Sequence, residues 1–77
     1  MPRLTPIHYG KFAKFLEYIG CQFVRQRGSH MIYRRSDLNR PIVFLASKQL
    51  STIVITNNLR TLNISKEKYL EILEKIK

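Results

Sequence analysis

A short segment from Arg25 to Arg35 concentrates residues that could bind phosphate and transfer a proton. Its eleven residues include four arginines, a glycine, a serine, a histidine and a tyrosine. Guanidinium groups bind phosphate through charge-assisted hydrogen bonds, and a histidine with an unperturbed pKa of about 6.5 can take up or release a proton near neutral pH. Such groups can cleave RNA without a metal, when a base removes the proton of a ribose 2′-OH and an acid protonates the leaving 5′-oxygen.

Residue type suggests a role for each candidate. His30 is the candidate catalytic residue, as general acid or general base. Gly28 and Ser29 precede it, and the Ser29 hydroxyl could orient the imidazole or bind phosphate. Tyr33 could stack on an unpaired base, or it could belong to the core. The candidate cations for binding RNA phosphates are Arg25, Arg27, Arg34 and Lys48.

Other interpretations of the same residues stay open. A histidine that follows a hairpin turn can be an ordinary exposed strand residue. Arg34 and Arg35 could form a solvated strand end that discourages pairing with other chains. The types of these residues therefore define a candidate site without proving one.

Charge and composition narrow the class of partner. Fourteen Lys and Arg against five Asp and Glu give a net charge of +9 and a pI near 10.2. The plainest partner for such a surface is a polyanion, most often nucleic acid, although an anionic membrane or an acidic protein would suit the same field. The longest apolar run, residues 42–46, is far too short to cross a bilayer, and the N-terminus carries no stretch like a signal peptide. We therefore expect a cytoplasmic protein that does not enter a membrane.

The single cysteine, Cys21, excludes an internal disulfide, and we expect it to be a small buried hydrophobic residue. No Asp, Glu, His and Cys cluster suggests a metal site, and we expect neither a metal nor a cofactor. A chain of 77 residues forms one domain, here residues 1–77, and buries only ~60% of the surface that its unfolded chain exposes.

The first expected element is a helix over residues 6–19. Thr5 can cap it, and Pro6 suits the first helical position because a missing N–H has no helical partner there. Gly20 can end it in a left-handed conformation. We expect His8 to be a surface or capping residue. Apolar residues recur at helical spacing at Phe12, Phe15, Leu16 and Ile19.

From Cys21 the sequence alternates with a period of two, which predicts a strand that ends in a hairpin at Gly28. His30, Ile32 and Arg34 share one face of the next predicted strand. A polar loop over residues 36–41 then leads to a third strand, residues 42–46, which is apolar enough to be the most buried of the three. Three strands with short connections form an antiparallel meander.

Helical spacing returns after a polar connection over residues 47–51. Ser51 or Thr52 can cap a helix, although the β-branched run 53–55 is an alternative strand signal. Asn63 can end this helix and Ser65 can cap the next one. The apolar stripe of that last helix could cover the core or meet a partner, which leaves the oligomeric state open; it consists of Tyr69, Ile72, Leu73 and Ile76.

The expected fold is therefore α+β, a three-stranded antiparallel sheet with helices packed on one face in the order αβββα and an additional C-terminal helix. This arrangement resembles the HicA family of small toxins over nearly the whole chain. The resemblance rests on Gly20, Arg25, Arg27, Gly28-Ser29-His30, Tyr33, Asn58-Leu59-Arg60 and Ile64-Ser65. It implies a fold like that of double-stranded-RNA-binding domains, mRNA interferase activity with the Gly-Ser-His histidine as catalytic residue, and neutralisation by a cognate HicB antitoxin.

One stretch departs from the family. After the third strand the family often carries a proline and a second histidine, where this chain has Leu45-Ala46-Ser47-Lys48. We therefore expect a metal-independent endoribonuclease toxin that acts on mRNA with His30 as its single catalytic histidine. The alternatives are a non-catalytic RNA-binding domain of the same fold and a protein-interaction module whose basic face serves an acidic partner.

Overall fold

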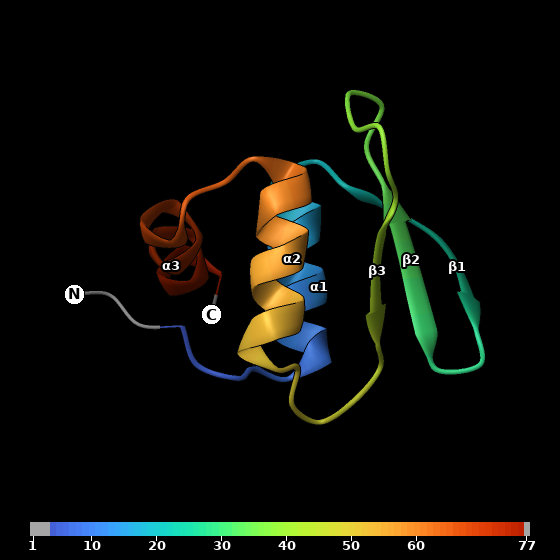
Figure 1. Cartoon of the computed structure of the whole chain (residues 1–77), viewed down its shortest axis with the longest axis horizontal. Coiled ribbons are helices and arrows are strands. Elements are labelled where there is room, and N and C mark those ends of the chain that lie inside the picture. Colours follow the sequence, from blue (N-terminus) through green and yellow to red (C-terminus); the bar gives the residue numbers. More distant parts are fainter. Residues whose placement is uncertain (1–3, 77) are drawn as a thin grey trace.

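The computed structural model describes residues 4–76 and has the expected fold class. A three-stranded antiparallel sheet in the order β1-β2-β3 is accompanied by three helices (Figure 1). The elements are α1 (Tyr9–Tyr18), β1 (Gln22–Arg27), β2 (His30–Arg34), β3 (Ile42–Leu45), α2 (Thr52–Leu62) and α3 (Lys66–Lys75). The predicted αβββα order with an extra C-terminal helix is thus confirmed.

Both α1 and α2 lie on one side of the sheet, and α3 lies beyond them on the side away from the strands (Figure 1). The helix α1 contacts the sheet through Phe12, whose ring packs edge-on against that of Phe44 of β3, with the ring centroids 5.2 Å apart. The helix α2 reaches it through the buried Asn58, whose Nδ2 donates to the Val43 carbonyl at 3.4 Å. Because the helices occupy one side only, no element within residues 4–76 covers the opposite face of the sheet.

The start of α1 differs from the sequence prediction. Thr5 and Pro6 do not begin the helix, because the chain is still extended at Ile7, whose carbonyl accepts from the Leu50 N–H at 2.7 Å. The cap is His8, whose Nδ1 accepts from the Gly10 N–H at 2.9 Å. Of the two roles expected for His8, the structure therefore supports capping.

The other predicted boundaries agree closely with the structure. Gly28 has φ +58° and no described non-glycine residue of the hairpin has a positive φ, which is the pattern of a type II′ turn between β1 and β2. Asn63 ends α2 in the left-handed conformation, and the hydroxyls of Ser51 and Ser65 cap α2 and α3. The β-branched run 53–55 lies inside α2, so the alternative strand interpretation is wrong.

The core lies between the sheet and the helices. Tyr69 of α3 is 1% exposed and packs edge-on against Phe15 at 4.9 Å, and its hydroxyl has no hydrogen-bond partner within residues 4–76. Cys21 is buried as expected, and burial raises the pKa of its thiol.

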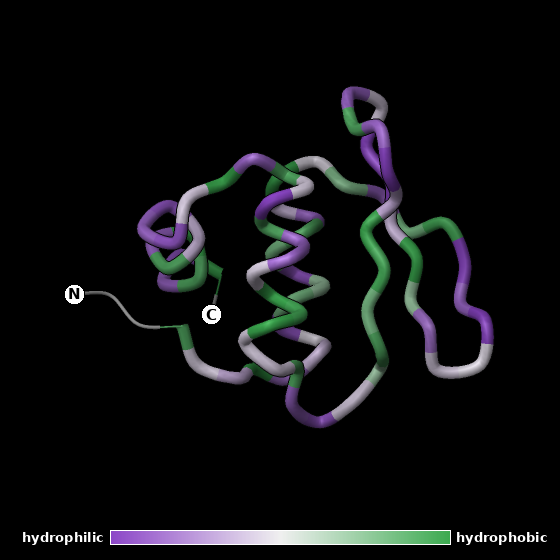
Figure 2. Tube along the Cα trace, viewed as in Figure 1, coloured by the Kyte–Doolittle hydropathy of each residue, from purple (hydrophilic) through white to green (hydrophobic). Residues whose placement is uncertain are grey.

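The third strand is the most buried of the three, as predicted, because two of its four residues are buried, against one in β2 and none in β1. Figure 2 shows a nearly continuous hydrophobic colour along β3. Nevertheless its exposure alternates, with Ile42 and Phe44 buried and Val43 and Leu45 at 38% and 48% exposed. Because the helices cover one face only, every second residue of an apolar strand remains accessible.

Candidate functional site

His30 is the first residue of β2, the central strand. It pairs with Arg27 of β1 and with Leu45 of β3, so all three side chains point to the same face of the sheet. The Ala46 N–H donates to the Ser29 carbonyl at 2.7 Å, which fixes the end of β3 beside the turn. His30 is exposed, so its imidazole is accessible from the uncovered side.

We call that side the open face. Cross-strand pairing identifies it, because the opposite face contains the buried Tyr33, Ile42 and Phe44. The open face contains basic, apolar and imidazole side chains, namely Arg25, Arg27, His30, Ile32, Arg34, Val43 and Leu45.

A β-bulge at Val24 places two arginines beside His30. The register shifts between Phe23 and Arg25, so Phe23 pairs with Tyr33 on the helix side while Arg25 pairs with Ile32 on the open face. A regular strand would have put Phe23 and Arg25 on one face, since they are two residues apart. The bulge lets β1 bury part of a phenylalanine and still direct its arginines to the histidine.

The four arginines of the segment differ in what they contact. Arg27 lies directly across from His30, Arg25 lies two pairs further along, and Arg34 lies at the far end of the open face opposite Gln22. These three are exposed. Arg27 is therefore the arginine placed closest to the imidazole, and Arg34 is the most remote.

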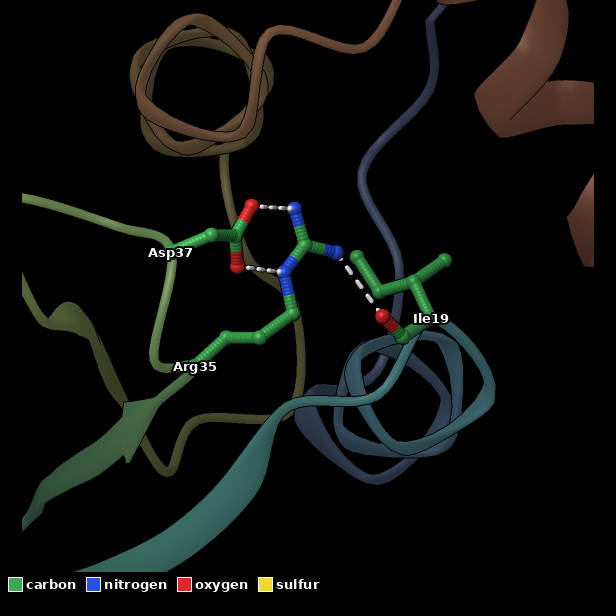
Figure 3. A network of polar contacts seen from close by, with 3 residues as sticks. All are labelled: Ile19, Arg35 and Asp37. Atoms are coloured by element: carbon green, nitrogen blue, oxygen red, sulfur yellow. Dashed lines mark hydrogen bonds and ion pairs between the residues drawn. The ribbon is translucent and has the colours of Figure 1, made fainter.

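Arg35 has a structural role instead. Its Nε and Nη2 donate to the two carboxylate oxygens of Asp37 at 2.6 and 3.1 Å, and its Nη1 donates to the Ile19 carbonyl at 2.8 Å (Figure 3). These hydrogen bonds between Arg35 and Asp37 lower the pKa of the Asp37 carboxyl and raise the pKa of the Arg35 guanidinium. The pair ties the loop after β2 to the end of α1.

Tyr33 does not fit the base-stacking role that the sequence suggested. Its side chain is 3% exposed and lies on the helix side of the sheet, opposite to His30. The Tyr33 ring stacks on that of Phe44 and packs edge-on against that of Phe23, with ring centroids 5.7 and 5.5 Å apart, respectively. Burial raises the pKa of the Tyr33 hydroxyl. The alternative, that Tyr33 belongs to the core, describes this placement.

A cavity of about 390 Å³ opens beside His30 at the edge of β3. It lies between this strand, the following loop and the first turn of α2. Among its lining residues, His30 is the only one with an ionisable side chain. The cavity is lined by His30, Val43, Phe44, Leu45, Ser47, Gln49, Leu50, Ser51 and Val54.

Two of the expected residues are neighbours in the chain of residues that line this cavity. Lys48 is exposed and falls in the chain between the lining residues Ser47 and Gln49. Ser29 is exposed in the turn beside His30. Gln49, which lines the cavity, could not be recognised from the sequence, because an isolated polar residue in a loop carries no pattern of its own.

Within residues 4–76 no group of three or more His, Cys, Asp and Glu side chains could hold a metal ion. In the same described part of the chain, none of the helices has the length and apolar character needed to cross a membrane.

The fold and site define a small α+β domain with a histidine and several arginines on the uncovered face of a three-stranded sheet. A family model described as the HicA toxin of bacterial toxin-antitoxin systems matches residues 9–64, which is more than half of the chain. The chain therefore belongs to the HicA toxin family, and a toxin of this kind has a cognate antitoxin. The match covers α1 to α2 and ends before α3. Neither the curated proteins nor the solved structures give a match.

Proposed function

We propose that this protein is a metal-independent endoribonuclease, an mRNA interferase that cleaves cytoplasmic mRNA, inhibits translation and is neutralised by a HicB-type antitoxin. One observation carries the proposal: in a chain of the HicA toxin family, an exposed His30 faces Arg27 across the sheet and borders a cavity. The net charge of +9 supports a polyanionic substrate.

The proposed chemistry uses groups of the open face. A base removes the proton of a ribose 2′-OH, the 2′-oxygen attacks the adjacent phosphorus, and the bond from phosphorus to the 5′-oxygen breaks as that oxygen takes a proton. The products are a 2′,3′-cyclic phosphate and a 5′-OH end. His30 acts as the base or the acid, while Arg27 stabilises the charge that develops on the phosphate.

The group that completes the proton transfer has fewer candidates than the sequence suggested. Tyr33 is no longer a candidate for this group, because its side chain is buried on the opposite face of the sheet. Lys48 and Ser29 remain, because both are exposed next to His30 or its cavity. Arg25 and Arg34 would hold neighbouring phosphates of the RNA along the open face.

The open face also suits a protein partner. Val43 and Leu45 of β3 are exposed on the open face, between the strands that carry the arginines and the cavity that both residues line. Exposed apolar side chains of this kind favour docking of another protein. An antitoxin with acidic and apolar side chains would cover His30 and exclude RNA.

The experiment is cleavage of an mRNA by the purified protein in EDTA, with His30→Ala as the test variant. His8→Asn is the matched control, since it removes the other histidine and keeps a capping residue. We expect wild type and His8→Asn to produce fragments with 2′,3′-cyclic phosphate ends, and His30→Ala to leave the RNA intact. Equal cleavage by His30→Ala would contradict the assignment.

The second candidate is a non-catalytic RNA-binding domain. It is favoured by the absence of a second ionisable side chain among the residues that line the cavity. It predicts tight, salt-sensitive RNA binding with the RNA intact after long incubation in wild type and both variants.

A further inference from the structure

We propose that the cavity beside His30 holds the unpaired nucleobase next to the scissile phosphate, and that Gln49 reads the edge of that base. The inference rests on the proposed function, because it places a base relative to the phosphate that His30 and Arg27 engage. It adds a specificity residue outside the Arg25–Arg35 segment.

The walls of the cavity match the two surfaces of a nucleobase. Side chains of Val43, Leu45 and Val54 supply apolar surface from β3 and α2. The polar side chains come from the loop and from the cap of α2, at Ser47, Gln49 and Ser51. An unpaired base has apolar faces and a polar edge, and single-stranded RNA is recognised through such splayed bases. Apolar walls with a few polar groups at one side therefore suit a base better than a phosphate.

The position of the cavity fits a base that neighbours the reacting phosphate. His30 lines the cavity and also pairs with Arg27 across the sheet, so the same residue adjoins both the apolar walls and a cation. A phosphate held by Arg27 beside His30 would leave the attached nucleoside near Leu45, which pairs with His30 and lines the cavity. The net charge of +9 on the chain favours RNA over an uncharged ligand.

The loop that carries Gln49 is fixed at several points. The Ser47 hydroxyl donates to the Gln49 carbonyl at 3.1 Å, and the Tyr9 N–H donates to the Ser47 carbonyl at 3.3 Å. The Leu50 N–H donates to the Ile7 carbonyl at 2.7 Å. A fixed loop holds a reading group in place with little loss of entropy on binding.

Gln49 is the polar lining residue best suited to read a base. The hydroxyl of Ser47 is engaged with the loop, and the hydroxyl of Ser51 accepts from the Val54 N–H as the cap of α2. Gln49 is exposed, and its side-chain amide offers a donor and an acceptor side by side. Such an amide can pair in bidentate fashion with a base edge, a contact worth about 1–3 kcal/mol of discrimination.

The first test maps cut sites in a random-sequence RNA for wild type, Gln49→Ala and the control Gln22→Ala, an exposed glutamine of β1 outside the cavity. We expect a preferred base beside the cut in wild type and in Gln22→Ala. In Gln49→Ala this preference falls about fivefold or more, while cuts still occur. No base preference in wild type, or an unchanged preference in Gln49→Ala, overturns the inference.

The second test separates this inference from the proposed function. It measures binding of the four homotetranucleotides to His30→Ala protein, with and without Gln49→Ala, by NMR titration. We expect one tetranucleotide to bind most tightly, with shifts at the amides of Gln49 and Val54, and the added Gln49→Ala to abolish that ranking. If wild type cuts no RNA but this ranking is found, the proposed function fails, and with it the placement beside a scissile phosphate, while base binding by the cavity and reading by Gln49 are supported. If Gln49→Ala weakens only the antitoxin complex, the cavity holds a protein side chain and the inference fails.

Discussion

Replacement of Tyr33 by alanine distinguishes a core residue from a base-stacking platform. The side chain is 3% exposed and contacts the rings of Phe44 and Phe23. Truncation of a buried aromatic residue to alanine costs about 3–5 kcal/mol. Small domains have only about 0.05–0.15 kcal/mol of stability per residue, so this loss is a large part of the total for a chain of 77 residues.

The expected shift in melting temperature follows from the same figure. In domains of this size about 1 kcal/mol corresponds to roughly 4–8 °C, so Tyr33→Ala should melt at least about 12 °C below its parent. Tyr33→Phe keeps the ring and should stay within a few degrees. Both are measured by circular dichroism in the His30→Ala background, which leaves RNA intact for binding assays.

A stacking platform would give the opposite pattern. Tyr33→Ala would then weaken RNA binding at low temperature while the melting temperature stayed within about 2 °C of the parent, as for a surface substitution. That result would refute the placement of Tyr33 in the core, and with it the assignment of the open face.

Three further predictions concern stability. Tyr69→Phe removes a buried hydroxyl that has no partner within residues 4–76, so the free energy of unfolding should rise by about 1 kcal/mol in urea titration; a fall of that size would mean that the hydroxyl is satisfied. Gly28→Ala should lose about 1–2 kcal/mol because φ is +58° there, although nothing lies within 4 Å of the added Cβ, whereas Ser29→Ala should change little; equal losses would argue against turn strain. Asp37→Asn should be less stable than wild type at pH 7, because the folded pKa of Asp37 lies below its usual value of about 3.9. The difference should vanish as the pH falls through that folded pKa, and a constant difference down to pH 2 would contradict this ion pair.

Local patterns in the sequence predicted most of the fold. Glycine at position 28, asparagine at 63 and serines at 51 and 65 act at single residues, so their turn and cap roles were readable without tertiary information. The start of α1 could not be predicted in this way, because the bridge between Ile7 and Leu50 depends on a contact between distant segments.

The residues of the candidate site could be proposed from the sequence, but their arrangement could not. His30 and Arg27 could be named from their types, whereas the bulge at Val24 reverses the faces of β1. A signal was present, because a regular strand would have put Phe23 on the same face as two arginines. The role of Tyr33 was ambiguous, since an aromatic strand residue fits either face until the helices are placed.

The most direct test of the central claim is the single-turnover rate of RNA cleavage by His30→Ala relative to wild type, in EDTA and with equal folded fractions. General acid-base catalysis by a side chain contributes about 10²–10⁴-fold, so the proposed role of His30 predicts a rate at least about 100-fold lower. A His30→Ala rate within about threefold of wild type would contradict it.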